Sequence, residues 1–306
     1  MGARGRRRRP RRRLDARPQR LPRARGRDGD GDGGRLIGER ELTVAATSPR
    51  IAVGEVAANI DALRAAVAEA VAAGAQLVVT PELATSGYVF ADEAEARGAA
   101  LRRDDPRWGA ISADLPEGVV AVIGYAEDAG DRVYNSAAVL SRSARLGDYR
   151  KSHLWGEEAR FFAPGDAAGA IFDTPVGRLG VAVCYDNEFP EVPRRLALAG
   201  AEVLALPVNW PLVDRPAGER APETIQAMAA ARSSRLATVI ADRHGSERGV
   251  AWTGGTAIID DDGWVAAAAP EGTGLVVAAL RLRHPRDKSL PPYNDLFGDR
   301  RPDLYT

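Results

Sequence analysis

Short runs of apolar residues alternate along the chain with segments whose apolar residues recur every three or four positions. Such runs are typical of buried strands, and the recurrence is typical of helices that bury one face. The predicted helices are residues 55–73, 190–199 and 219–234. The predicted strands are residues 41–47, 76–82, 119–127, 136–141, 178–186, 202–210, 236–242, 256–263 and 275–280.

The order of these elements indicates a layered α/β domain. A strand, a helix that stops at Gly74 and a second strand that stops at Pro81 follow one another, as in a βαβ unit. Many strands with few helices favour sheets covered by helices. No linker interrupts residues 41–285, so we predict one catalytic domain over residues 41–306. Its last stretch is rich in Pro and Arg and is expected to run irregularly over the surface.

Residues 1–40 differ in composition from the rest, with 15 arginines and five acidic residues among Gly and Pro. A segment with so few apolar residues cannot form a core, so we predict that residues 1–40 are a disordered tail. Such a tail is either a basic arm for nucleic acid or an anionic membrane, or an extension that catalysis does not need. The second interpretation is favoured because no aromatic residue stands between the arginines.

The zero net charge of the chain hides an acidic body. Residues 41–306 contain 27 basic and 37 acidic residues, which argues against a nucleic-acid binder. Cys184 is the only cysteine, so no intrachain disulfide is possible and nothing indicates an oxidising compartment. No run approaches the roughly 20 apolar residues of a membrane span, and no apolar signal segment follows the arginines. We expect a cytoplasmic protein that binds neither nucleic acid nor a membrane.

Three polar clusters each follow a predicted strand, where α/β folds usually carry their sites. In the first, Glu82 follows Pro81, and partial desolvation there would raise its pKa and suit it to proton transfer. A surface glutamate at a proline turn is the competing interpretation. In the second, Lys151 lies among aromatic and acidic residues. A lysine paired with two carboxylates in a cleft stabilises an oxyanion, although lysines on solvated faces are usually inert.

The third cluster contains Cys184, at the end of an apolar run that leads towards a helix. A sharp turn of this kind exposes a side chain in the manner of a nucleophile elbow. The nearby helix N-terminus is expected to lower the pKa of the thiol. The alternative is a buried structural cysteine, which the charged residues that follow at once make less attractive.

The clusters contain the motifs PELATSGY (81–88), YRKSHL (149–154), EARFFAPGD (158–166) and CYDNEFPE (184–191). Their order and context resemble the carbon–nitrogen hydrolase (nitrilase) superfamily over roughly residues 41–306. Further matches are Asn59, YNSA (134–137), LPVNWP (206–211) and RRPDLY (300–305). The resemblance implies a four-layer αββα sandwich that forms a homodimer or larger homo-oligomer through one helical face. Counting strands does not imply this.

The resemblance also implies a catalytic triad of Glu82, Lys151 and Cys184, with Glu158 as an additional active-site glutamate. Glu158 is preferred to Glu157 because only Glu158 has the E-x-x-x-F-x-P-G spacing. The backbone N–H of Tyr185 is expected to help Lys151 bind the oxyanion.

Other residues are expected to shape the pocket. Tyr88, Trp155 and Trp210 are predicted to line it, although a role as core aromatics is equally compatible with the sequence. Arg150 and Arg243 either bind a substrate carboxylate or lie on the surface.

Two departures from the family pattern affect the expected pocket or packing rather than the reaction class. Thr47 or Ser48 stands where the family often has Gln, and residues 242–245 read Asp-Arg-His-Gly where N-R-x-G is common.

The implied reaction is cleavage of a non-peptide C–N bond in a small amide or N-carbamoyl compound, through a thioester on Cys184. No metal or cofactor is expected, because His153, His244 and His284 form no metal-ligand pattern. Cys-Tyr-Asp resembles the amidase and carbamoylase branches more than the C-W-E of nitrilases. A nitrilase, an acyltransferase and a non-catalytic binding protein on the same fold stay open, as does a dyad of Cys184 with His153.

Overall fold

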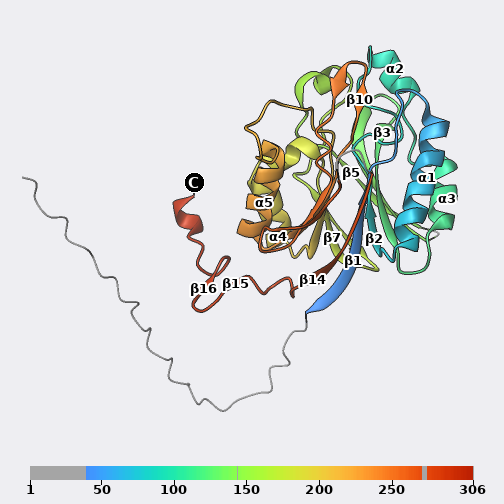
Figure 1. The fold of residues 1–306 in the computed structure, drawn as a ribbon. Coiled ribbons are helices and arrows are strands. Elements are labelled where there is room, and N and C mark those ends of the chain that lie inside the picture. Colours follow the sequence, from blue (N-terminus) through green and yellow to red (C-terminus); the bar gives the residue numbers. More distant parts are fainter. Residues whose placement is uncertain (1–38, 143, 271–273, 306) are drawn as a thin grey trace, which may run out of the picture. The chain divides into compact units, whose positions relative to one another are not determined.

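Two six-stranded sheets pack face to face in the computed structural model, which describes residues 39–142, 144–270 and 274–305 (Figure 1). Helices α1 (Val56–Ala72) and α3 (Arg107–Asp114) cover the outer face of the first sheet. Helices α4 (Glu191–Leu198) and α5 (Pro222–Ser234) cover the second. The order of layers is therefore helix, sheet, sheet, helix, which confirms the predicted four-layer αββα sandwich.

The first sheet combines a parallel centre with antiparallel edges. Its strands, in spatial order, are β14 (Leu275–Leu282), β1 (Arg40–Thr47), β2 (Leu77–Val79), β3 (Val120–Asp128), β4 (Val133–Ser141) and β5 (Ala144–Arg150). The β1–β2 and β2–β3 pairs are parallel, and the others are antiparallel. The strands predicted at residues 119–127 and 136–141 correspond to β3 and β4, which form an antiparallel hairpin.

The second sheet has the same mixed character. Its strands, in spatial order, are β13 (Val265–Ala268), β12 (Ala257–Ile259), β9 (Ala237–Ala241), β8 (Val203–Pro207), β7 (Gly177–Val181) and β6 (Ala170–Thr174). Strands β7, β8 and β9 run parallel. The central strands of both sheets are covered by the other sheet on one face and by helices on the other, so they are buried and apolar nearly throughout rather than alternating.

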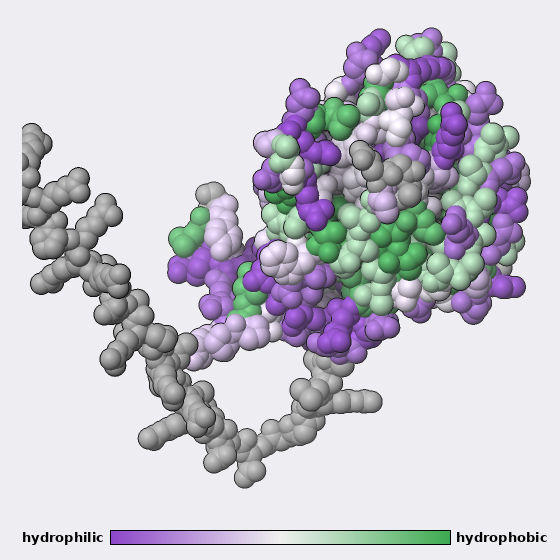
Figure 2. Space-filling view, in the orientation of Figure 1, coloured by the Kyte–Doolittle hydropathy of each residue, from purple (hydrophilic) through white to green (hydrophobic). Residues whose placement is uncertain are grey.

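Helix α1 follows from its apolar spacing. Ile60, Leu63, Val67 and Ala70 are buried against the outer face of the first sheet, while the opposite side of the helix is exposed. The helix ends two residues before Gly74, whose φ of 90° only glycine adopts readily. Figure 2 shows hydrophilic side chains over much of the outer flanks of the described part, as expected for helices that bury one face.

The remaining elements are short. They are α2 (Glu93–Gly98), the 3₁₀ turns η1 (Gly156–Arg160), η2 (Cys184–Glu188) and η3 (Pro302–Leu304), and the strand pairs β10 (Ser246–Glu247) with β11 (Val250–Ala251) and β15 (Ser289–Leu290) with β16 (Asn294–Asp295). The C-terminal stretch lies beside α4 and α5 (Figure 1), where Lys288 donates to the carbonyl of Arg235 and Arg194 stacks on Phe297.

The three predicted helices are found within three residues of their expected ends, whereas α2, α3, β5, β6, β13 and the two-residue strands were not predicted. Four predicted strands end earlier than expected: β2 at Val79, β7 at Val181, β8 at Pro207 and β12 at Ile259. After β2, β7 and β8 the apolar runs continue beyond the last ladder hydrogen bond because the turns that follow are also buried. The predicted tail lies outside the described residues, except for Glu39 and for Arg40, which begins β1.

Candidate active site

The turns that follow strands β2, β5 and β7 bring Glu82, Lys151 and Cys184 together. Lys151 comes directly after β5, Glu82 follows β2 by three residues, and Cys184 begins η2 just after β7. Strands β2 and β5 belong to the first sheet and β7 to the second, so the site joins the two sheets. The thiol lies close enough to Glu82, Lys151 and Glu158 for their charges to act on its pKa.

Lys151 is fully buried between two carboxylates. Its Nζ donates hydrogen bonds of 2.7 Å to Oε1 of Glu82 and 2.7 Å to Oε1 of Glu158. Burial alone would lower the pKa of Lys151, but the charges of Glu82 and Glu158 raise it well above its usual value. The lysine therefore remains a cation inside the protein, as an oxyanion-binding group must.

Each carboxylate has a second donor and one oxygen without a partner. Asn135 Nδ2 donates to Oε1 of Glu82 at 2.7 Å, and the hydroxyl of Tyr88 donates to Oε1 of Glu158 at 2.5 Å. The Oε2 atoms of both glutamates are buried and have no hydrogen-bond partner among the described residues. Unpaired buried acceptors are costly, so these two oxygens indicate where a proton or a substrate donor belongs.

The surroundings of Glu82 suit it to accept a proton near neutral pH. Burial raises its pKa from 4.5 to about 7, with the charge of Lys151 opposing the shift and that of Glu158 adding to it. A general base works best when its pKa lies near the working pH. The expectation of a raised pKa is confirmed, and the alternative of a surface glutamate is wrong because the side chain is fully buried.

Cys184 sits at the predicted sharp turn. Its φ of 49° lies in the left-handed region, which a residue with a Cβ adopts only under constraint from its surroundings. The expected lowering of its pKa is wrong: burial first, and then the charge of Glu82, raise the pKa of the thiol well above its usual value. The charge of Lys151 opposes this shift without overcoming it. The thiol is therefore neutral at rest and depends on a base for activation.

The turn that carries Glu82 is also strained. Leu83, the next residue, has a φ of 50°. This turn presses on strand β3, where a Cβ at Gly124 would collide with the carbonyl oxygen of Pro81 and with Glu82 itself. Gly124 is thus the residue that lets the turn approach the sheet and fixes the depth of the base.

Asp186 joins the turn of Cys184 to the segment of Lys151. Its carboxylate accepts hydrogen bonds from the backbone N–H of Val183 at 2.9 Å and from the hydroxyl of Tyr149 at 2.7 Å. It also accepts from the hydroxyl of Ser152 at 3.1 Å. Donors from the Cys184 turn and from the Lys151 segment therefore meet at one buried carboxylate, which fixes the position of the nucleophile relative to the lysine.

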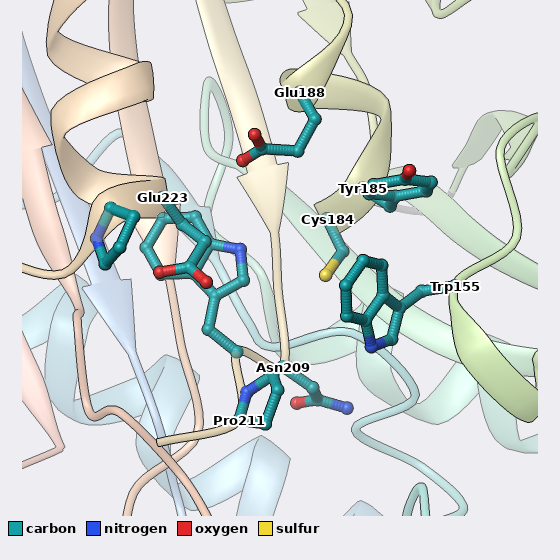
Figure 3. Close-up of a pocket in the computed structure, with 9 residues that line it drawn as sticks. Trp155, Cys184, Tyr185, Glu188, Asn209, Pro211 and Glu223 are labelled. Carbon is teal, nitrogen blue, oxygen red and sulfur yellow. The ribbon is translucent and has the colours of Figure 1, made fainter. Parts of the chain in front are cut away.

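Two cavities open beside the site. The first, of about 330 Å³, is lined by Trp155, Cys184, Tyr185, Glu188, Asn209, Trp210, Pro211, Pro222 and Glu223 (Figure 3). The second, of about 300 Å³, is lined by Tyr88, Val89, Phe90, Trp155, Gly156, Glu157, Glu158, Phe161, Phe162, Pro211, Val250 and Trp252. Trp155 and Pro211 line both cavities. Tyr185 and Trp210 thus lie in the first cavity and Tyr88 in the second.

The carbon-nitrogen hydrolase family model matches residues 43–286 of the chain. The chain belongs to the carbon-nitrogen hydrolase family. A nitrilase of Pyrococcus abyssi is 38% identical to this hydrolase over 242 residues, which are 78% of the chain and 88% of that protein. An N-carbamoylputrescine amidase of Arabidopsis thaliana is 29% identical over 294 residues, 88% of the chain and 95% of that protein.

Solved structures agree with the sequence relatives. The crystal structure of an amidase from Nesterenkonia sp. matches the hydrolase with a TM-score of 0.71 at 25% identity, covering 89% of this chain and 97% of that one. The hydrolase is therefore an enzyme that acts on carbon–nitrogen bonds other than peptide bonds.

Several residues of the site were missed at the sequence level. Asn135 was noted only as part of YNSA and Asn209 only as part of LPVNWP, yet Asn209 Nδ2 donates to the carbonyl of Glu82 at 2.9 Å. Glu188 and Glu223 of the first cavity were not singled out. The motif that contains each asparagine was the available signal. For Glu223, which lies in an ordinary helix, no local signal exists.

The two arginines considered for a substrate carboxylate have partners within the protein. Arg150 forms two hydrogen bonds with Glu127, of 2.6 and 3.0 Å, and stacks on Tyr134. Arg243 is buried and pairs with Glu247, so the surface alternative is wrong for it. Neither lines the two cavities.

One of the two departures from the family pattern, Asp242, supports a wall of the first cavity. Asp242 is fully buried and accepts the backbone N–H of Trp210 at 2.9 Å and that of Gly255 at 2.7 Å, which fixes a wall of the first cavity. Burial raises the pKa of Asp242 to about 8. Ser48 contacts His244 at 3.1 Å.

The described residues contain neither a cluster suited to a metal ion nor a helix suited to span a membrane. In that part of the chain, no three His, Cys, Asp or Glu side chains are arranged to hold a metal ion. No helix there is long and apolar enough to cross a membrane.

Proposed function

We propose that this hydrolase cleaves the C–N bond of a small amide or N-carbamoyl compound through a thioester on Cys184, with Glu82 as base and Lys151 as oxyanion donor. The observation that carries the proposal is the buried Lys151, bridged between Glu82 and Glu158 at 2.7 Å beside the only cysteine of the chain. A buried cation between two carboxylates gains little net stability for the fold, so chemistry is the better reason for it.

The first step is attack by Cys184 on the carbonyl carbon. Because the thiol is neutral at rest, Glu82 takes its proton as the C–S bond forms. The free Oε2 of Glu82 is the atom available for that proton, since Oε1 already accepts from Lys151 and Asn135. Lys151 and the backbone N–H of Tyr185 then stabilise the negative oxygen of the tetrahedral intermediate.

The second half of the reaction reverses these roles. Glu82 gives its proton to the departing nitrogen, ammonia or an amine leaves, and the acyl group stays on Cys184 as a thioester. Water, deprotonated by Glu82, attacks the thioester, and the acid leaves with the thiol restored. Glu158 holds Lys151 in place throughout, itself oriented by the hydroxyl of Tyr88.

Amides are preferred to nitriles as substrates on two grounds. The nucleophile is followed by Tyr185 and Asp186 rather than by the Trp-Glu typical of nitrilases. Among the relatives, N-carbamoylputrescine amidases recur, and an amidase of Nesterenkonia sp. has been solved with acrylamide added at its active site cysteine. A relative named as a nitrilase keeps nitrile hydrolysis as the second candidate.

A screen of small amides, N-carbamoyl compounds and nitriles for ammonia release tests the proposal. We expect release from amides or carbamoyl compounds, and none after Cys184→Ala. Mass spectrometry of the intact protein should detect an acyl group bound to Cys184 at steady state. Transfer of the acyl group to an added amine, instead of release of the free acid, would indicate an acyltransferase. A protein that turns over none of the compounds, or an active Cys184→Ala variant, would refute the proposal.

Oligomeric state and location are independent proposals. We propose that the hydrolase forms a homodimer in the cytoplasm. Sedimentation equilibrium tests the dimer, and fractionation of the cells that produce the protein tests the location.

A further inference from the structure

Among the residues that the structure describes, two carboxylates, Glu188 and Glu223, and no basic side chain line the first cavity beside Cys184. We infer that this cavity recognises compounds that carry a cation, an ammonium or guanidinium group, at the end remote from the scissile bond, and that Glu188 and Glu223 bind that cation. That the bound compounds are substrates rests on the proposed function. That the cavity attracts cations rests on its lining alone.

The two carboxylates reach the cavity from different elements. Glu188 is the last residue of η2, which begins at Cys184, and Glu223 lies in the first turn of α5. Figure 3 shows both side chains directed into the cavity that Cys184 also lines. The fold therefore places two acidic groups, 35 positions apart in sequence, around one space that leads to the nucleophile.

Neither carboxylate is neutralised within the described part of the chain. No Lys, Arg or His side chain there forms an ion pair with Glu188 or Glu223, although 24 such pairs occur elsewhere. Oε2 of Glu223 is buried and lacks a hydrogen-bond partner. Burial, and then the charge of Glu223, raise the pKa of Glu188. Because the charge of Glu223 disfavours the ionised form of Glu188 and no described basic side chain lines the cavity, the two carboxylates form a site for a cation.

A separate observation shows that the cavity is built for a ligand with N–H donors. Asn209 is 1% exposed and lines the cavity. Its Nδ2 is committed to the carbonyl of Glu82, which leaves Oδ1 buried without a partner. Oδ1 can only accept a hydrogen bond, so the missing partner is a donor such as a substrate amide or ureido N–H. This atom would hold the nitrogen end near the triad while the carboxylates hold the cation.

The walls of the cavity favour the same class of ligand. Trp155, Tyr185 and Trp210 supply aromatic surface, which packs against an alkyl chain and attracts cations through its π face. The lining contains no basic side chain, and Arg150 and Arg243 are paired elsewhere. A substrate carboxylate would therefore meet two negative charges and no counterion. At about 330 Å³ the cavity is at the small end of ligand sites, which limits the ligand to a short chain.

Three amides of matched shape test whether the enzyme prefers substrates with a cationic remote end. They are δ-aminovaleramide, hexanamide and the monoamide of adipic acid, whose remote ends are cationic, neutral and anionic. We expect kcat/KM to fall in that order, with about tenfold or more between cation and neutral amide at low salt, as for a close charge pair near a surface. In the double variant Glu188→Gln, Glu223→Gln the ratio of cationic to neutral kcat/KM should fall towards one. Glu219→Gln, which removes an exposed charge outside the cavity lining, should keep the ratio.

A second experiment measures the effect of the cavity's charge on the rate at which Cys184 is labelled, and it needs no substrate turnover. Because Cys184 is the only cysteine, methanethiosulfonate reagents modify one site, forming a disulfide with release of methanesulfinate. We expect the aminoethyl reagent to react faster than the sulfonatoethyl reagent at low salt, and the difference to shrink at high salt and in the double variant but not in Glu219→Gln.

The two experiments separate the possible failures. Equal kcat/KM for the three amides, or a ratio unchanged in the double variant, overturns the inference and leaves the amidase proposal intact. If no amide is hydrolysed but labelling still prefers the cationic reagent and depends on Glu188 and Glu223, the proposed function fails and cation recognition stands. Labelling that is indifferent to charge, or faster with the anionic reagent, overturns the inference.

Discussion

The carboxylate of Asp186 lies 2.8 Å from Nδ1 of His153. The imidazole stacks on Phe189, with ring centroids 3.9 Å apart, and is half-buried. The charged groups with the largest effects on the pKa of the Cys184 thiol are Glu82, Lys151 and Glu158. The hydrogen bonds of the His153 ring go to Ser152 and Asp186. The histidine therefore helps to position the turn through Asp186, and a Cys184–His153 dyad has no support in the geometry.

Replacing His153 distinguishes these roles. His153→Phe keeps the stacking on Phe189 and removes the ring nitrogens, while Asp186 retains its bonds to Tyr149, Ser152 and Val183. We expect kcat to fall by less than about tenfold, whereas loss of a general base costs about a hundredfold or more. The test is a comparison of kcat for His153→Phe and Glu82→Gln by steady-state kinetics. A loss in His153→Phe as large as in Glu82→Gln would make His153 the base.

The triad itself predicts non-additive losses. Lys151→Ala should lower kcat by about a hundredfold or more, the usual effect of losing an oxyanion donor. Glu82→Gln keeps the shape but cannot take a proton and should be similarly severe. Since both act on one transition state, the double variant should be little worse than the worse single variant.

Circular dichroism must show that these variants fold. Arg64→Ala is the matched control, because it breaks an exposed ion pair with Asp114 away from the site and should leave kcat within about twofold. Additive losses in the double variant, or near-normal rates in either single variant, would contradict a shared role.

The longer elements and the turns that carry Glu82 and Cys184 were readable from sequence because their signals are local, whereas the four-layer arrangement was implied only by the family resemblance. Glu82 and Cys184 each follow an apolar run, and in both turns a residue with positive φ, Leu83 or Cys184, marks the sharp bend that the motifs implied. Helix α1 was predicted to within one residue because its spacing is regular over 17 residues. Helix α2 is only six residues long, too short for a periodic pattern to stand out.

The rest of the site depends on contacts between segments distant in sequence. Glu223 enters the cavity only because α5 packs beside η2, and nothing in its own segment distinguishes it from a surface glutamate. The direction of the pKa shift of Cys184 was mispredicted for a similar reason. A helix N-terminus is visible in the sequence, but complete burial beside Glu82 and Glu158 is a property of the packed structure.

Gly124 should couple stability to activity. A methyl group there collides with the turn that carries Glu82, so Gly124→Ala should lower the free energy of unfolding by about 1–3 kcal/mol. It should also displace the base and lower kcat/KM by about tenfold or more, since small misplacements of catalytic groups are costly.

Gly109→Ala is the matched control for Gly124. It lies in α3, a new Cβ there meets no atom within 4 Å, and alanine is the better helix former. Urea unfolding and steady-state kinetics on both variants test the pair. A Gly124→Ala enzyme with normal stability and normal kcat/KM would show that the turn has room to move.

The pKa of Glu82 predicts the acid limb of the pH profile. The base works only when ionised, and burial raises its pKa from 4.5 to about 7. Below that pH the carboxyl is protonated, so kcat/KM should fall about tenfold for each unit of pH, with the bend near neutrality rather than near 4.5. Because Glu82 is coupled to Lys151 and Glu158, the bend reports the cluster as a whole.

Asn135 supplies the variant that tests this assignment. Its hydrogen bond to Oε1 of Glu82 favours the ionised form and lowers the pKa. Asn135→Ala should therefore move the acid limb to higher pH. Ser136→Ala is the control, because Ser136 is the next residue of β4 and donates instead to Glu127. Measured kcat/KM profiles for the three enzymes should show a shifted limb in Asn135→Ala alone. A limb that bends near the ordinary glutamate pKa, or that stays in place in Asn135→Ala, would mean that another group supplies the base.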